Sequence, residues 1–151
     1  MHTASTIDSS TDTTPGRRSS SLRREALIGA VIATTVNAVI WAVGRALGVT
    51  FHVRPESGSE VGILLVIPAT LVLFAAGMWL FGRAARRSRR LAVAVLVAGV
   101  LFAVASTGGV LWAAEDAATA SLLVTMHLVT GAVFAVTAAR TLATSARDIR
   151  S

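Results

Sequence analysis

Residues 83–90 read RAARRSRR, and they lie between two apolar stretches, 61–82 and 91–114. Five arginines within eight residues interrupt what would otherwise be one long hydrophobic run. Each flanking stretch has the roughly twenty residues that a helix needs to cross a hydrocarbon core of about 30 Å. The segment therefore predicts two membrane-spanning helices joined by a short basic turn.

The alternation of apolar and polar segments continues in both directions along the chain. Two further apolar stretches, 26–47 and 117–139, bring the number of candidate spans to four. We therefore predict an all-α fold, a four-helix transmembrane bundle formed by residues 25–142. The Ser/Thr-rich residues 1–24 have too few large apolar side chains to offset chain entropy and are predicted to be a disordered tail. Residues 143–151 are predicted to form a second, short tail.

The distribution of the fourteen arginines predicts how the bundle sits in its membrane. Only Arg45 and Arg54 belong to one side, and the other twelve belong to the opposite side. Ten of these twelve are taken as the topology determinants: Arg17, Arg18, Arg23, Arg24, Arg83, Arg86, Arg87, Arg89, Arg90 and Arg140. Because basic residues favour the cytoplasmic side, both termini and both tails are expected in the cytoplasm.

The amino-acid composition also predicts the source of the protein and its partners. Arginine without any lysine, together with abundant Ala, Val and Gly, is typical of a GC-rich bacterial genome, which points to a bacterial plasma membrane. The net charge of +6 would suggest nucleic acid in a soluble protein, but here topology and anionic lipid headgroups explain it. The expected partners are therefore the lipid bilayer, those headgroups, and another copy of the chain or another membrane protein.

Several function classes are excluded by missing residue types. The chain has no cysteine, which removes disulfides, thiolate metal sites and thiol–disulfide chemistry. No span contains Asp or Glu, unlike the small four-span exporters that use a buried Glu, and a bis-His haem would need a second intramembrane histidine. The adjacent Glu115 and Asp116 are expected to form a solvated turn. We expect no catalytic residue, no metal and no cofactor, and we do not expect an enzyme.

Asn37 and His127 are the candidate intramembrane polar pair. Counted from the cytoplasmic ends of their spans, Asn37 lies roughly 16 Å deep and His127 roughly 18 Å deep at 1.5 Å per residue. A polar side chain near the bilayer midplane needs a partner, because no water is available there. We expect the first and fourth spans to be adjacent and Asn37 to hydrogen-bond His127, with Thr34, Thr130 or a backbone carbonyl completing the set. Such a pair is either a packing pin or a site for a ligand, proton or substrate.

Three cues together resemble a known family. They are the Asn in the first span within 35–48, the Arg-rich middle loop, and the Met-His pair in the last span within 122–129. They resemble an uncharacterised actinobacterial family of small four-span membrane proteins, family 6069 among the domains of unknown function. The resemblance covers about residues 24–142 and implies four helices in the membrane. It implies no activity.

Two functional hypotheses lead at this point, and a third, an enzyme acting on lipid, would need a polar cluster at one interface, where the sequence offers only Glu115, Asp116 and nearby Ser/Thr. The leading one is a small non-enzymatic membrane protein with a structural or partner-binding role. The alternative is a small-solute transporter or channel subunit that uses Asn37 and His127. A midplane cavity lined by both side chains would favour the alternative, and a tightly packed bundle would favour the leading hypothesis.

Overall fold

The computed structural model describes residues 16–53 and 59–147 of the chain, and it is almost entirely helical. The elements in chain order are α1 (Gly16–Ala46), β1 (His52–Val53), β2 (Ser59–Glu60), α2 (Ile63–Arg87), α3 (Arg89–Ala113) and α4 (Ala117–Arg147). All four helices contain a segment long and apolar enough to cross a membrane. This confirms the predicted four-helix bundle of membrane-spanning helices.

Two helices extend into segments that were predicted to be tails. α1 begins at Gly16, so the prediction of disorder is wrong for residues 16–24, and α4 continues to Arg147. Extending an existing helix adds one hydrogen bond per residue without a new nucleation cost, and Arg and Ala are favourable helix formers. The helices therefore continue past their apolar segments. The predicted tails over residues 1–15 and 148–151 fall outside the described residues.

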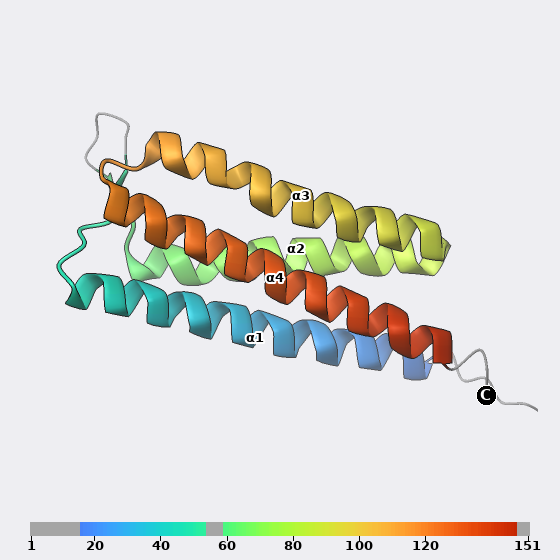
Figure 1. The fold of residues 1–151 in the computed structure, drawn as a ribbon. Coiled ribbons are helices and arrows are strands. Elements are labelled where there is room, and N and C mark those ends of the chain that lie inside the picture. Colours follow the sequence, from blue (N-terminus) through green and yellow to red (C-terminus); the bar gives the residue numbers. More distant parts are fainter. Residues whose placement is uncertain (1–15, 54–58, 148–151) are drawn as a thin grey trace, which may run out of the picture.

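The four helices form a closed ring in which α1 and α3 each pack against both α2 and α4. Figure 1 shows their axes running along a common direction. The α2–α3 turn, the start of α1 and the end of α4 lie together, and we call this the arginine end. The opposite end carries residues 47–53, 59–62 and 114–116, and we call it the loop end. The two halves of the bundle are named after these ends.

A single residue, Ser88, connects α2 to α3 at the arginine end. Its backbone N–H donates to the carbonyl of Ala84 at 3.0 Å, which satisfies the end of α2. Its Oγ accepts from the N–H of Leu91 at 3.1 Å, which caps the start of α3. One serine in an extended conformation therefore ends one helix and begins the next.

The arginine half has a filled core of large side chains. Phe74, Met78, Phe81 and Phe134 are buried, and the rings of Phe74 and Phe134 meet edge to face with centroids 6.4 Å apart. Gly99 is required beside Phe134, because a Cβ at that position would lie 2.5 Å from the ring. The absence of a side chain there lets α3 and α4 approach closely.

Phe51 closes the loop end of the bundle. It is fully buried although its φ is 57°, a left-handed conformation that bulky residues rarely adopt. Its ring packs near Trp41, with centroids 6.3 Å apart, and against Gly44, where a Cβ would lie 2.6 Å from Cζ. Its carbonyl accepts from the N–H of Val61 at 3.0 Å. These contacts hold Phe51 over the loop end of the helices.

Candidate functional site: a polar cavity within the bundle

A cavity of about 350 Å³ lies in the loop half of the bundle. Side chains from all four helices line it, and most of them are apolar. Its polar lining residues are Asn37, Thr70, Ser106, His127 and Thr130. The space is therefore an apolar chamber with a few polar groups, the usual composition of a small-molecule site.

The floor and the opening of the cavity are formed by different elements. Phe74 and Phe134, which lie at the top of the arginine-half core, line the floor. Leu65 and Leu73 of α2 and Phe102 of α3 also line the cavity, yet they are 57%, 54% and 65% exposed. Figure 1 shows α3 meeting α2 at the turn and separating from it towards the loop end. The cavity therefore opens sideways between α2 and α3.

Asn37 ties three helices together beside the cavity. Its side chain is only 3% exposed, and its Nδ2 donates to Thr70 Oγ1 of α2 and to Thr130 Oγ1 of α4, at 3.0 Å each. The Thr130 hydroxyl donates to the carbonyl of Met126 at 2.9 Å, so it accepts from Asn37. This fixes the orientation of the amide. The Asn37 Oδ1 is buried and has no hydrogen-bond partner among the described residues.

His127 lines the same cavity but bonds to its own helix. Its Nδ1 lies 2.8 Å from the carbonyl oxygen of Leu123. A carbonyl oxygen only accepts, so Nδ1 carries the hydrogen, and in the neutral ring Nε2 is left as an acceptor. The sequence correctly predicted that α1 and α4 are adjacent. The predicted hydrogen bond is wrong, because Asn37 bonds to Thr70 and Thr130 instead of His127.

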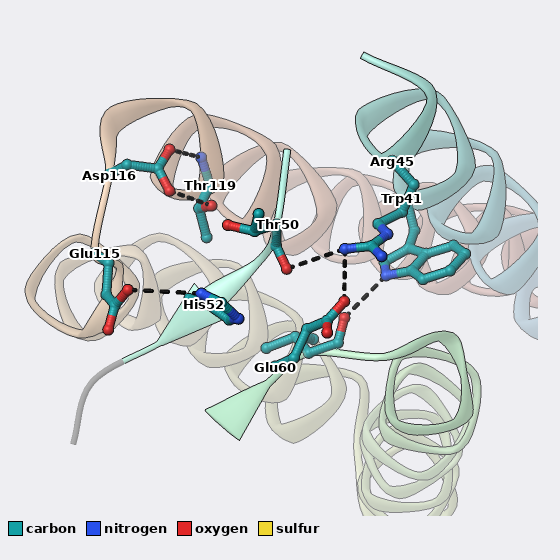
Figure 2. Close-up of polar contacts among 9 residues, drawn as sticks. Trp41, Arg45, Thr50, His52, Glu60, Glu115, Asp116 and Thr119 are labelled. Atoms are coloured by element: carbon teal, nitrogen blue, oxygen red, sulfur yellow. Dashed lines mark hydrogen bonds and ion pairs between the residues drawn. The ribbon is translucent and has the colours of Figure 1, made fainter. Parts of the chain in front are cut away.

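The loop end carries a second polar cluster, shown in Figure 2. Arg45 forms an ion pair with Glu60 at 2.6 Å and donates to the carbonyl of Thr50 at 3.3 Å. The indole N–H of Trp41 donates to the carbonyl of Val61 at 2.9 Å. These contacts join the end of α1 to the segment that leads into α2. They hold the segment that leads into α2 against the end of α1.

The two adjacent carboxylates of the loop end have separate partners (Figure 2). Glu115 Oε2 lies 3.8 Å from His52 Nδ1, and both side chains are partly exposed. Asp116 caps α4, because its carboxylate accepts from the backbone N–H of Thr119 at 2.8 Å and from its hydroxyl at 2.7 Å. The backbone N–H of Thr119, followed by its hydroxyl, lowers the pKa of Asp116 below the ordinary 3.8. The two carboxylates therefore contact different groups, Glu115 the imidazole of His52 and Asp116 the first turn of α4.

The predicted topology determinants gather at the arginine end. The described arginine side chains of this group are exposed there: Arg23, Arg24, Arg83, Arg86, Arg87, Arg89, Arg90 and Arg140. The guanidinium of Arg83 lies over the ring of Trp79, 5.6 Å from its centroid. The side chains of Arg17 and Arg18 fall outside the described part of α1. One end of the bundle is therefore strongly basic, as the arginine count predicts.

Within residues 16–53 and 59–147, no group of three or more His, Asp or Glu side chains is placed to hold a metal ion.

Four apolar helices of spanning length define the class of this protein, a multi-pass membrane protein. A model of a family of unknown function (DUF6069) matches residues 17–144, and the chain belongs to this family. The match confirms the resemblance that Asn37, the Arg-rich turn and His127 suggested. No curated protein and no solved structure matches the chain.

Proposed function

We propose that the protein is a non-enzymatic component of the bacterial plasma membrane, with both termini and the arginine end in the cytoplasm. The clustering of exposed arginines at one end supports this orientation, since basic residues favour the cytoplasmic side. The same cluster would lie at the level of the anionic lipid headgroups, which become its partners.

The chain offers a direct test of this orientation because it contains no cysteine. Ser88→Cys places a thiol at the arginine end, and Glu115→Cys places one at the loop end. A membrane-impermeant maleimide added to intact cells should label Glu115→Cys and leave Ser88→Cys unlabelled until the cells are opened. Labelling of Ser88→Cys in intact cells would reverse the proposed orientation.

We further propose that the bundle binds a small apolar molecule in its cavity, as a transporter or channel subunit does. The observation that carries this proposal is a chamber lined by both Asn37 and His127. At about 30 Å³ per non-hydrogen atom, the share of one liquid water, the cavity would hold roughly a dozen atoms.

A binding experiment with two matched variants tests this role. Purified protein is titrated with 4-fluorotoluene and 4-fluorobenzyl alcohol, two small aromatic probes, and fluorine NMR reports binding. Ala69→Leu fills the cavity from α2, whereas Ala76→Leu adds the same volume at an exposed position of α2 outside the cavity lining. Saturable binding should be lost in Ala69→Leu and kept in Ala76→Leu. If neither probe binds saturably to the wild type, the proposed role fails.

A partner-binding role is the second candidate, and the exposure of α3 favours it. Among the described side chains of this helix, Ala92 is the buried one. A Cβ at Gly108 or Gly109 would meet open space, so a neighbouring helix has room to approach. Native mass spectrometry of the purified protein should then show a second copy or a foreign subunit, and Gly109→Leu should release it. A strictly monomeric species would exclude this candidate.

A further inference from the structure

We propose that the ligand of the cavity is a neutral, membrane-dissolved alcohol, held between the imidazole of His127 and the hydroxyl of Thr70. The inference rests on the proposed binding role of the cavity and names the chemistry of its ligand. It follows from counting which hydrogen-bonding groups of the lining are already used within the protein.

Three polar residues of the lining have no hydrogen left to donate. The two hydrogens of Asn37 Nδ2 go to Thr70 and Thr130. The hydroxyl of Thr130 donates to Met126, and the hydroxyl of Ser106 donates to the carbonyl of Ala103 at 2.9 Å. These residues can therefore only accept a further hydrogen bond.

Thr70 and His127 supply the remaining groups, one donor and one acceptor. Thr70 Oγ1 accepts from Asn37, and its own hydrogen has no acceptor among the described residues. His127 has used its Nδ1 hydrogen on Leu123, so Nε2 of the neutral ring accepts. His127 precedes Thr130 by three residues and shares its helix face, and Thr130 and Thr70 bind the same amide nitrogen. The donor and the acceptor therefore line the same cavity from α2 and α4.

An alcohol matches this arrangement better than other small polar groups. Its oxygen accepts from Thr70, and its hydrogen is donated to His127. A ketone or an ether can only accept, so it would leave the imidazole nitrogen unpaired. A carboxylate or an ammonium would bring a charge into an apolar chamber, which carries a large desolvation cost.

The opening of the cavity indicates where the alcohol comes from. The exposed rim residues Leu65, Leu73 and Phe102 belong to the membrane-spanning segments of α2 and α3. The opening therefore faces the hydrocarbon region, and a ligand would enter from the bilayer. The apolar lining receives the hydrocarbon part, and the two polar groups orient the hydroxyl.

The test compares the two fluorinated probes, which differ in one hydroxyl group. The Ala69→Leu protein, whose cavity is filled, serves as the background. Titrating it measures how much of each probe partitions into detergent, and the affinities are corrected for this amount. Wild type should bind 4-fluorobenzyl alcohol about tenfold more tightly than 4-fluorotoluene, the net effect of the two hydrogen bonds acting together. His127→Leu and Thr70→Val should reduce this preference at least about fivefold. His127→Gln, which keeps an acceptor at a similar reach, should retain it.

The two proposals fail in different ways. Equal corrected affinities for the two probes, or a preference that survives in His127→Leu, would overturn the alcohol assignment and leave the binding role intact. Absence of saturable binding by both probes would overturn the binding role itself. Thr70→Val also removes an acceptor of Asn37, so its helicity and melting are recorded alongside. His127→Leu removes no hydrogen bond between helices and keeps the test decisive if Thr70→Val misfolds.

Discussion

The arginine half and the loop half of the bundle are built from the same four helices, but the loop half combines a smaller core around Phe51 and Met126 with a cavity. In the arginine half, Phe74, Phe81 and Phe134 fill the space between the helices, and Gly99 lets one ring sit against a backbone. In the loop half, the helices separate around a cavity of about 350 Å³. One short bundle can therefore combine a tightly packed core at one depth with space for a ligand at another.

The change from one packing regime to the other occurs within two turns of α4. Phe134 belongs to the filled core, and His127, seven residues earlier, lines the cavity. Asn37 holds three helices at the boundary through hydrogen bonds to two threonines. We infer that the filled half supplies most of the stability and that the polar contacts mainly fix how the open half is aligned.

The largest expected effect tests the filled half. Phe134→Ala removes a buried ring and joins the cavity to the arginine-half core, so the free energy of unfolding should fall by about 3 kcal/mol. Unfolding in mixed micelles with increasing dodecyl sulfate, followed by circular dichroism, measures it. Phe102→Ala makes the same change at a 65% exposed position and should cost only about 0.5 kcal/mol. Equal losses in the two variants would remove the distinction between the halves.

The next effect measures the polar contact at the boundary. Asn37→Leu and Thr130→Val each delete one side of an interhelical hydrogen bond. A double-mutant cycle in the same unfolding assay should give a coupling of about 0.6 to 1.7 kcal/mol, the range of such bonds in membrane proteins. His127→Leu combined with Asn37→Leu provides the matched control and should be additive. Coupling of Asn37 to His127 instead would restore the pairing that the sequence suggested.

The smallest effect concerns the loop end and its dependence on pH. Because the folded-state pKa of Asp116 lies below 3.8, its ionised form favours folding above about pH 4. This contribution is lost as the pH falls through the folded-state pKa. Asp116→Asn can still cap α4 but does not titrate, so the melting temperature of wild type relative to this variant should drop between pH 6 and pH 3.

The architecture was predictable because it depends on one-dimensional patterns. Arginine clusters and apolar runs mark where each helix meets a polar environment, and depth along each span placed Asn37 and His127 at one level. Both do line a single cavity. The prediction of disorder over residues 16–24 failed for a related reason. Composition indicates which residues can be buried, whereas a helix that has already formed can continue through exposed residues because each adds a backbone hydrogen bond.

Of the two partners of Asn37, Thr130 was among the residues that the sequence suggested, and Thr70 was not. Thr70 lies twelve residues from the arginine-side end of its predicted span, so depth alone would have placed it level with Asn37. Depth does not give the rotation of a helix about its axis, and threonine hydroxyls commonly bond to their own helix. Thr130 bonds both to its own helix and to another helix, since it donates to Met126 and accepts from Asn37. Only the packed bundle shows which hydroxyls face inward.

The one-residue turn at Ser88 has a mechanical consequence. α3 has 25 residues and is therefore a rod about 37 Å long. Its pivot is Ser88, the single residue that joins it to α2. A tilt of about five degrees at the pivot displaces the far tip by roughly 3 Å, the width of a water molecule. At that tip the chain is tethered by the bridge between Val53 and Ala114. Packing against α4 resists such a tilt along the length of α3, and the bridge adds a tether at the tip, where the displacement would be largest.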